Sequence, residues 1–384
     1  MWHGIRLAAS GLVCVAVFSF SGVAGELARD SGVVKQAVKQ NVERVLDTFE
    51  VGDNVFVRAL HVEKSRNVMW VGTSVGVQEI DLASNTPRNT FTRKHGLANE
   101  YIFAVGIDSL GYKWFGTNAG GASRYKDGFW KTYFPMHGLA DYWVYSFAND
   151  LKGDVWIGTW YGVNHFDIKT QKFTTYIKEL VNEWVYGMGV DAQGKVWFGT
   201  EGGVSVFDDQ QADGKKWRAW THKDGLGAPN VEGLPSSPNT GLGTRSRHDL
   251  AVQISSGSTY NPGYVFALLV APDNTIWAGT WGGGVAQFDG KTWKNFTRKD
   301  GLAGNIVFSI ASDDRGVLWF GTENGVSRYD GKTWRSYRQQ DGLLSNSVYA
   351  LAVATNGDVW AGSRRGVTRI GYSPTTALIT LPKH

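Results

Sequence analysis

The sequence predicts an all-β fold, a single seven-bladed β-propeller made of four-stranded antiparallel blades. The first observation is a phrase, Trp-x-Gly-Thr or Trp-x-Gly-Ser, whose successive tryptophans lie 44, 42, 41, 80, 42 and 41 residues apart. Repetition at such an interval marks stacked supersecondary units. The second observation is that each repeat reads as four short strands joined by tight turns. Small sheets that each pack between two similar sheets close into a ring. The tryptophans of the phrase are Trp70, Trp114, Trp156, Trp197, Trp277, Trp319 and Trp360.

The sixth repeat, residues 305–343, shows the expected elements in order. An apolar segment at 306–311 predicts the first strand, and the phrase itself, at 318–322, predicts the second. Glycine-containing turns then separate a third strand at 326–329 from a fourth at 334–338. Each repeat is therefore expected to be one antiparallel meander.

The second strand indicates how neighbouring sheets pack. Side chains alternate along a strand, so Trp319 and Gly321 point to one face while Leu318 and Phe320 point to the other. Both faces are apolar, which predicts a sheet that is covered on both sides. A glycine two residues after a large indole leaves room for the next sheet to approach closely.

The 80-residue interval raises the question of an eighth blade. In five repeats a leucine in the link precedes the tryptophan by 17 residues, whereas Leu226 precedes Trp277 by 51. The excess of 34 residues indicates an insertion at about 227–263, between blades 4 and 5, which is rich in Pro, Gly and Ser and lacks the phrase. Long loops are usually functional or disordered. Two interpretations of the segment 245–249 follow. It is a lid over the ring in one, and part of a flexible surface loop in the other.

Closure of the ring needs a fourth strand for the last blade. Three strands are expected at 347–354, 359–363 and 367–371. The fourth comes either from 377–381 or from the N-terminal segment near 45–50. We favour the N-terminal segment because of its place in the repeat. It stands just before the first blade, in the same way that the fourth strand of the sixth repeat, at 334–338, stands just before the seventh blade.

The first 25 residues read as a secretory signal peptide, with Arg6 before an apolar stretch at 7–20 and small residues at 23–25. The propeller would then occupy residues 26–384, with a lead-in over 26–54. The single cysteine, Cys14, lies in the apolar stretch, so the mature chain would contain no disulfide and no thiol nucleophile. These features predict a periplasmic or secreted protein.

Charge and hydropathy exclude two classes of partner. The net charge is +4 and no basic run is present, which argues against nucleic acid or an anionic membrane surface. After the signal peptide no apolar run approaches the length of a membrane span, so no membrane insertion is expected after cleavage.

The repeats resemble the two-component regulator propeller repeat, which occurs in periplasmic ligand-binding sensor domains of hybrid histidine kinases. The match is carried by the phrase itself, the Gly-Val that follows the turn (Gly325-Val326 and Gly162-Val163) and the Asp-Gly-Leu link (300–302 and 341–343). It covers nearly all of residues 55–371. Members of the kinase type usually contain two propellers, a membrane span and a transmitter domain, whereas this chain contains one propeller. The resemblance implies a sensor-type module, here without a kinase.

The candidate ligand-binding residues lie in the turns after the phrase. These turns and the links open on one end of the ring, which we call the top. Side chains that differ between repeats at equivalent loop positions are the informative ones, and large aromatics in short turns usually need a cover. Indoles would stack on a sugar or an aromatic ring, while carboxylates and guanidinium groups would bind its polar edge. The alternative is that these are ordinary solvated turn residues. The predicted site residues are Trp160, Tyr161, Glu201, Trp281, Glu323, Arg364 and Arg365.

A second set recurs on the first strand of each repeat, which should line the axis. An aromatic residue stands eleven positions before the tryptophan in six repeats, and Arg58 takes about that place in the first. Packing between neighbouring blades is the favoured explanation, because repetition without variation is typical of a core position. A collar around a channel is the alternative. The aromatic residues are Phe103, Tyr145, Tyr186, Phe266, Phe308 and Tyr349.

Two histidines, His95 and His137, replace the Asp of the link in adjacent repeats. They lack a third ligand at suitable spacing, so capping of a turn explains them better than metal binding. We expect no cofactor and no resident metal.

Three function classes remain open. The first is a non-enzymatic module that binds a small molecule or an oligosaccharide at the top face. The second is a scaffold for an exported or membrane protein partner. The third is a metal-dependent lyase-type enzyme, which the absence of H-x-x-H and G-x-S-x-G motifs disfavours.

Overall fold

The computed structural model describes residues 34–230, 233–236 and 259–381. The predicted signal peptide (1–25) and the segment 245–249 lie outside these residues. Contacts divide the chain into two compact units, of which Asn41–Pro374 contains the repeats and the other includes residues 34–40 and 375–381. Among the residues described, no helix is long and apolar enough to cross a membrane.

The repeats form seven four-stranded antiparallel sheets, which confirms the predicted fold class. Blade 1 contains β2 (Val57–Glu63), β3 (Val68–Thr73), β4 (Gly76–Asp81) and β5 (Thr86–Phe91); blade 2 contains β6 (Ile102–Ile107), β7 (Lys113–Thr117), β8 (Ala122–Lys126) and β9 (Phe129–Tyr133). Blade 3 contains β10 (Val144–Asn149), β11 (Val155–Thr159), β12 (Gly162–Asp167) and β13 (Lys172–Tyr176); blade 4 contains β14 (Val185–Val190), β15 (Val196–Thr200), β16 (Gly203–Phe207) and β17 (Trp217–Trp220).

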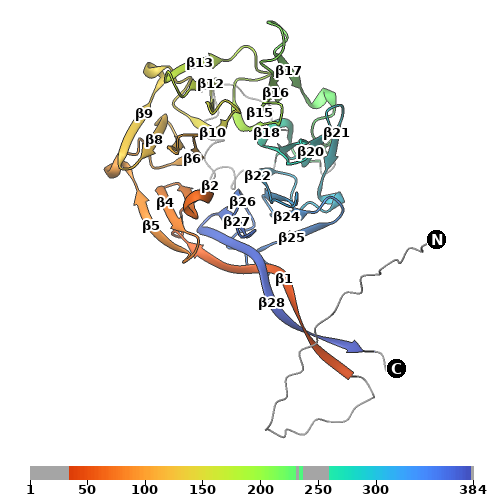
Figure 1. Cartoon of the computed structure of the whole chain (residues 1–384). Coiled ribbons are helices and arrows are strands. Elements are labelled where there is room, and N and C mark those ends of the chain that lie inside the picture. The colour runs from red at the N-terminus through yellow and green to blue at the C-terminus, as the bar shows by residue number, and fades with distance from the viewer. Residues whose placement is uncertain (1–33, 231–232, 237–258, 382–384) are drawn as a thin grey trace, which may run out of the picture. The chain divides into compact units, whose positions relative to one another are not determined.

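The remaining blades follow the same plan. Blade 5 contains β18 (Asn261–Val270), β19 (Ile276–Trp281), β20 (Val285–Phe288) and β21 (Trp293–Phe296); blade 6 contains β22 (Val307–Ser312), β23 (Leu318–Thr322), β24 (Gly325–Tyr329) and β25 (Trp334–Tyr337). Blade 7 contains β26 (Val348–Val353), β27 (Val359–Ser363), β28 (Gly366–Leu381) and β1 (Val34–Glu50). Figure 1 shows the sheets arranged in a ring, with β2, β6, β10, β18, β22 and β26 toward the centre and β5, β9, β13 and β21 at the periphery.

Short 3₁₀ helices occur in five of the links between blades, whereas η1 (Lys64–Arg66) lies inside blade 1, between β2 and β3. His95 and His137 cap two of the links. The Nδ1 atom of His95 accepts a hydrogen bond from the backbone N–H of Thr92 (3.0 Å), and that of His137 accepts one from Phe134 (3.0 Å). Aspartates occupy this position in three other links. The prediction of capping histidines is confirmed. The helices are η1 (Lys64–Arg66), η2 (Arg93–His95), η3 (Pro135–His137), η4 (His222–Asp224), η7 (Arg298–Asp300) and η8 (Gln339–Asp341).

The glycine of the phrase allows neighbouring blades to pack closely, as predicted. A Cβ on Gly72 of blade 1 would lie 2.7 Å from Ile102 Cγ2 of blade 2. The same relationship closes the ring, because a Cβ on Gly362 of blade 7 would lie 2.6 Å from Val57 Cγ1 of blade 1. Distances this short are steric clashes, so a larger residue at the glycine would push the adjacent blades apart.

The N-terminal strand completes the last blade, as its position in the sequence favours. In that sheet β1 pairs with β28, and the order is β1-β28-β27-β26. Glu43 of β1 fixes this strand against blade 6: its carboxylate accepts hydrogen bonds from the Tyr337 hydroxyl (2.5 Å) and from Arg328 Nε (3.1 Å). Residues 294 positions apart in sequence thereby join the two ends of the ring.

Candidate functional site

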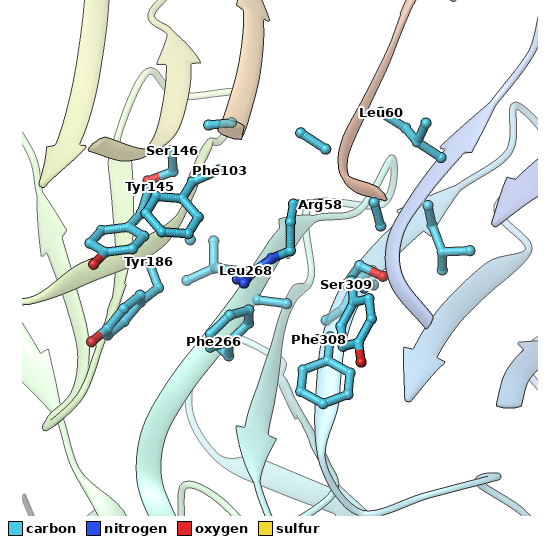
Figure 2. Close-up of a pocket in the computed structure, with 18 of the residues that line it drawn as sticks. Arg58, Leu60, Phe103, Tyr145, Ser146, Tyr186, Phe266, Leu268, Phe308 and Ser309 are labelled. Atoms are coloured by element: carbon cyan, nitrogen blue, oxygen red, sulfur yellow. The ribbon is translucent and has the colours of Figure 1, made fainter. Parts of the chain in front are cut away.

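An axial cavity of ≈ 260 Å³ is lined by the inner strands of all seven blades. Each inner strand contributes one side chain to its ring, here called the collar: Arg58, Phe103, Tyr145, Tyr186, Phe266, Phe308 and Tyr349. Figure 2 shows Arg58 reaching toward the middle of this ring, with the labelled aromatic residues around it. Larger hollows of ≈ 560 and ≈ 680 Å³ lie between blades 4 and 5 and between blades 5 and 6, but each involves two blades only.

A β-bulge occurs where each collar side chain leaves its strand. In blade 1 the register runs from Val57 paired with Thr73 to Ala59 paired with Gly72, so Arg58 is the extra residue. A register shift also occurs at the collar residue of the inner strand in the other six blades. A bulge re-aims the extra side chain. The bulge therefore explains why strands that pack on both faces also present one ring of side chains to the axis.

The collar residues contact one another around a complete circle. Consecutive aromatic centroids, from Phe103 through to Tyr349, are 4.9, 5.0, 5.5, 5.9 and 5.2 Å apart. The guanidinium of Arg58 closes the circle, with Cζ 5.1 Å from the Phe103 centroid and 6.0 Å from that of Tyr349. The favoured prediction, packing between blades, is therefore incomplete, because the same side chains also form the collar given as the alternative.

A second ring, which the sequence analysis missed, lies next to the collar. It consists of the residue two positions before each collar residue, and we call it the mouth tier. Trp143 stacks on Phe103 at 6.1 Å, and Tyr264 lies 4.9 Å from Tyr186. The signal was present in the sequence, because an aromatic residue stands two positions before the collar residue in five blades. The mouth tier is Phe56, Tyr101, Trp143, Trp184, Tyr264, Ile306 and Ser347.

Two of the predicted ligand-binding residues, Trp160 and Trp281, are buried rather than exposed in their turns. Only 7% and 8% of their surfaces are accessible. Trp160 is wedged edge-on between Trp143 (4.9 Å) and Trp184 (5.5 Å). The Trp281 indole N–H donates to Thr259 Oγ1 (3.0 Å), near the end of the insertion. Each indole inserts among mouth-tier side chains and fixes them, because indoles bury a large apolar area in short turns.

Of the predicted carboxylates, Glu201 is buried and Glu323 is partly buried, and backbone or phenol groups bind them. Glu201 is 1% exposed and accepts a hydrogen bond from the Tyr186 hydroxyl (3.5 Å). Glu323 accepts from the backbone N–H groups of Asn305 (2.9 Å) and Ile306 (3.0 Å). Burial raises the pKa of Glu323 to about 7, and the backbone hydrogen bonds oppose this shift. Glu201 thus borders the collar through Tyr186, whereas Glu323 fixes the entry to blade 6.

The remaining predicted residues lie at the exposed rim. Arg364 donates to Asn54 Oδ1 (2.6 Å) and lies 5.9 Å from the Phe56 ring. Arg365 is bound to acidic groups of the lead-in, Glu50 (3.3 Å) and Asp53 (3.5 Å). Tyr161 is half exposed. The structure therefore brings Trp160 and Trp281 into one apolar cluster with the collar, places Arg364 beside the mouth tier and leaves Arg365 outside it.

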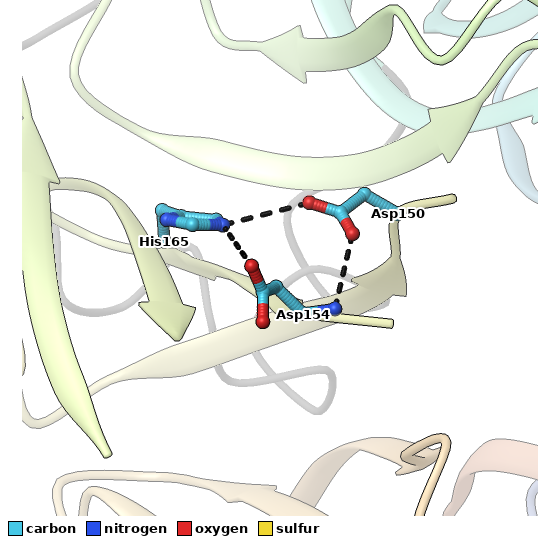
Figure 3. A group of neighbouring side chains, drawn as sticks. All are labelled: Asp150, Asp154 and His165. Carbon is cyan, nitrogen blue, oxygen red and sulfur yellow. Dashed lines mark hydrogen bonds and ion pairs between the residues drawn. The ribbon is translucent and has the colours of Figure 1, made fainter. Parts of the chain in front are cut away.

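Three side chains at the other end of blade 3 have the composition of a metal site. Figure 3 shows His165 Nε2 between Asp150 Oδ2 (3.5 Å) and Asp154 Oδ2 (3.2 Å). Asp150 already accepts hydrogen bonds from the Trp156 indole (3.1 Å) and from backbone N–H groups of its turn. In blade 2 an arginine, Arg124, pairs with the equivalent turn aspartate. His165 is thus explained as a cationic partner of a structural turn.

The family comparison confirms the recognised repeat. Residues 301–324 match the sequence model of the family described as "Two component regulator propeller". No curated protein matches the chain significantly.

Solved structures share the fold. Extracellular domains of two hybrid two-component systems from B. thetaiotaomicron superpose with TM-scores of 0.65 and 0.61, at 20% and 18% identity. The matches cover 83% and 85% of this chain but 39% of each of those chains, so this chain spans well under half of their length. A virginiamycin B lyase from Staphylococcus aureus, solved with quinupristin, gives a TM-score of 0.60 at 12% identity, over 87% of this chain and 99% of its own. At sequence identities this low, the structural similarity shows only that these proteins share the fold.

Proposed function

We propose that this propeller, whose repeat is that of the two-component regulator propellers, is an exported, non-enzymatic sensor-type module that binds a small molecule at the top of its axis. The observation that carries the proposal is the collar around the axial cavity, with the side chains of the mouth tier packed against the aromatic rings of the collar. Propeller axes and other concave sites lined by aromatic residues with few polar groups are common ligand sites.

The direction of the aromatic side chains favours a small ligand over a protein partner. Trp184 and Tyr264 are buried in one cluster with the collar. Hot spots of protein interfaces are also rich in Trp and Tyr, but they belong to a surface that a partner can cover. Side chains that converge on the axis instead suit a ligand that enters the ring. An exported location is supported by the extracellular domains among the structural neighbours.

The experiment is a thermal-shift screen of the chain from residue 26 onward against neutral sugars, carboxylic acids, neutral aromatics and divalent cations. Hits are then measured by calorimetry on two variants with half-buried indoles, Trp143→Ala in the mouth tier and Trp334→Ala on the outer strand β25. We expect binding that Trp143→Ala weakens at least tenfold and that Trp334→Ala leaves unchanged.

Two results would contradict the proposal. A ligand whose affinity falls equally in both variants would bind elsewhere or report only on stability. A screen without a response from any class would favour the scaffold alternative, which pull-downs from the exported proteome would then test.

A further inference from the structure

One position of the collar differs in kind from the other six. Six blades place an aromatic ring there, and blade 1 places the guanidinium of Arg58. The Nη1 atom of Arg58 is shielded from solvent and has no hydrogen-bond partner in the described part of the chain. Among the described residues no carboxylate forms an ion pair with Arg58; its contacts are the faces of Phe103 and Tyr349.

Arg58 as a whole is half-buried, and the burial of its Nη1 atom is energetically unfavourable without a further group. A guanidinium carries five N–H donors and no acceptor, and it is protonated at any pH at which proteins fold. A charge that is removed from water is normally paired, because aromatic faces replace only part of the lost hydration. The cavity therefore contains a cation whose ordinary partner, an oxyanion, is not supplied by the described residues.

Two hydroxyl groups of the same cavity lack partners as well. Ser146 and Ser309 line it, and their Oγ atoms are buried without a hydrogen-bond partner among the residues described. Buried polar atoms in folded proteins almost always have a partner, so unsatisfied donors around one cavity indicate an acceptor-rich occupant. A carboxylate is such an occupant, because it accepts several hydrogen bonds and matches the guanidinium fork.

We infer that the axial cavity binds the carboxylate of a small organic monoacid, with Arg58 as its anchor and the body of the acid against the aromatic rings. The inference rests on the proposed function and adds the class of ligand that the axial cavity would bind. One cation in the collar suits one negative charge. Glu201 borders the same ring through Tyr186, and its carboxylate disfavours a dianion there. A cavity of ≈ 260 Å³ suits a group about the size of benzoate.

The test compares acids with neutral molecules of the same shape. Benzoate, cyclohexanecarboxylate and phenylacetate are titrated calorimetrically into the chain from residue 26 onward, each against its primary amide, with sodium sulfate as an inorganic anion. The measurements are repeated on Arg58→Gln. The matched control is Arg218→Gln, since Arg218 is an exposed arginine stacked on the Trp220 ring at 5.0 Å, on the outer strand of blade 4.

We expect at least one of the acids to bind and its amide to bind at least tenfold more weakly. Arg58→Gln should weaken the affinity for the acid at least tenfold, and Arg218→Gln should leave that affinity unchanged. The inference is overturned if no acid binds, if amides bind as well as acids, if sulfate competes as strongly as the acids, or if Arg58→Gln binds unchanged. Circular dichroism of the ligand-free variants shows whether both are folded. Arg58→Lys, which keeps the charge but not the fork, should recover part of the affinity.

The proposed function and this inference fail in different ways. If neutral sugars bind at the mouth with an affinity that depends on Trp143, and no acid binds, the sensor-type function is supported and the carboxylate site is contradicted. If acids bind with an affinity that depends on Arg58 but not on Trp143, the anion site is supported and the mouth tier takes no part in it.

Discussion

The indole of Trp281 stacks on the phenol ring of Tyr264, with centroids 5.4 Å apart and an angle of 9° between the planes. Tyr264 belongs to the mouth tier, and Trp281 is the residue after the repeated phrase of the same blade. This contact shows that a side chain at the end of a strand, here the last residue of β19, can be directed into the ring at the top face. It also makes Trp281 a structural support of the mouth.

Trp281→Ala is expected to destabilise the protein by about 3 to 5 kcal/mol, because it removes a buried aromatic side chain and leaves a cavity. Tyr161→Ala, which truncates a half-exposed aromatic in the equivalent turn of blade 3, should change stability by about 0.5 kcal/mol or less. Chemical denaturation of both variants measures the difference. Equal effects would show that Trp281 does not support the mouth.

Arg58→Phe should raise the free energy of unfolding of the ligand-free protein by about 1 kcal/mol, because it replaces a guanidinium without a counterion by an aromatic ring, as found at this position in both neighbouring blades. Guanidinium chloride or urea titrations measure the change. A loss of stability instead would mean that the stacking of Arg58 on Phe103 and Tyr349 outweighs its desolvation.

Glu43→Gln should weaken closure of the ring by about 3 kcal/mol, because it leaves Arg328 without its buried carboxylate. Glu50→Gln is the matched control on the same strand, since Glu50 pairs with Arg365 at an exposed site and should matter little. Thermal unfolding of both variants provides the comparison. If the two variants unfolded alike, the contact of Glu43 with blade 6 would not hold β1 in place.

His165 should stabilise the fold in acid and not in base. Burial opposes its charge, but the hydrogen bond to Asp150 and the charge of Asp154 outweigh burial and raise the pKa of His165. A raised folded-state pKa gives stability that is complete below the unfolded value of 6.5 and is lost as the pH rises through the folded value.

The His165→Gln variant isolates this effect. It should be less stable than the wild type by about 1 kcal/mol at pH 5 and equal to it near pH 9. The comparison is made between variants because burial lowers the pKa of His61, which acts in the opposite direction over the same range. A difference that did not change with pH would show that the ion pair contributes nothing.

Glu323 should make the protein less stable as the pH rises from about 4.5 to about 7. Burial raises the folded-state pKa to about 7 from an ordinary value of 4.5, so the folded protein binds this proton more tightly than the unfolded chain. The loss is on the order of 3 kcal/mol. Glu323→Gln removes the titration and should show a difference from the wild type that varies with pH in this window only. A constant difference would mean that the backbone hydrogen bonds keep Glu323 ionised.

The architecture could be predicted from the sequence because the features that determine it lie within a single repeat. The indole and glycine of the phrase are two residues apart, and their close approach to the next blade follows from strand geometry, as Gly72 and Ile102 show. The capping of links by His95 and His137 likewise depends on three neighbouring residues. Such features need no knowledge of the closed ring.

The site was predicted less well, because its geometry depends on the ring as a whole. The turn residues Trp160 and Trp281 differ between repeats and so stand out in the sequence, but the structure buries them. Trp143 and Trp184, which flank Trp160, precede the strands that they cover and were missed.

The sequence by itself determined the number of blades, their strands and the position that lines the axis, since these follow from a periodicity of side chains along the chain. Only the tertiary structure decided what the axis contains. A bulge at the collar residue of each inner strand turns seven side chains inward, and closure of the ring through Glu43 and Val57 brings them together. The solitary charge of Arg58 among six aromatic rings exists only in that closed arrangement, because the seven residues are spread over nearly 300 positions of the chain.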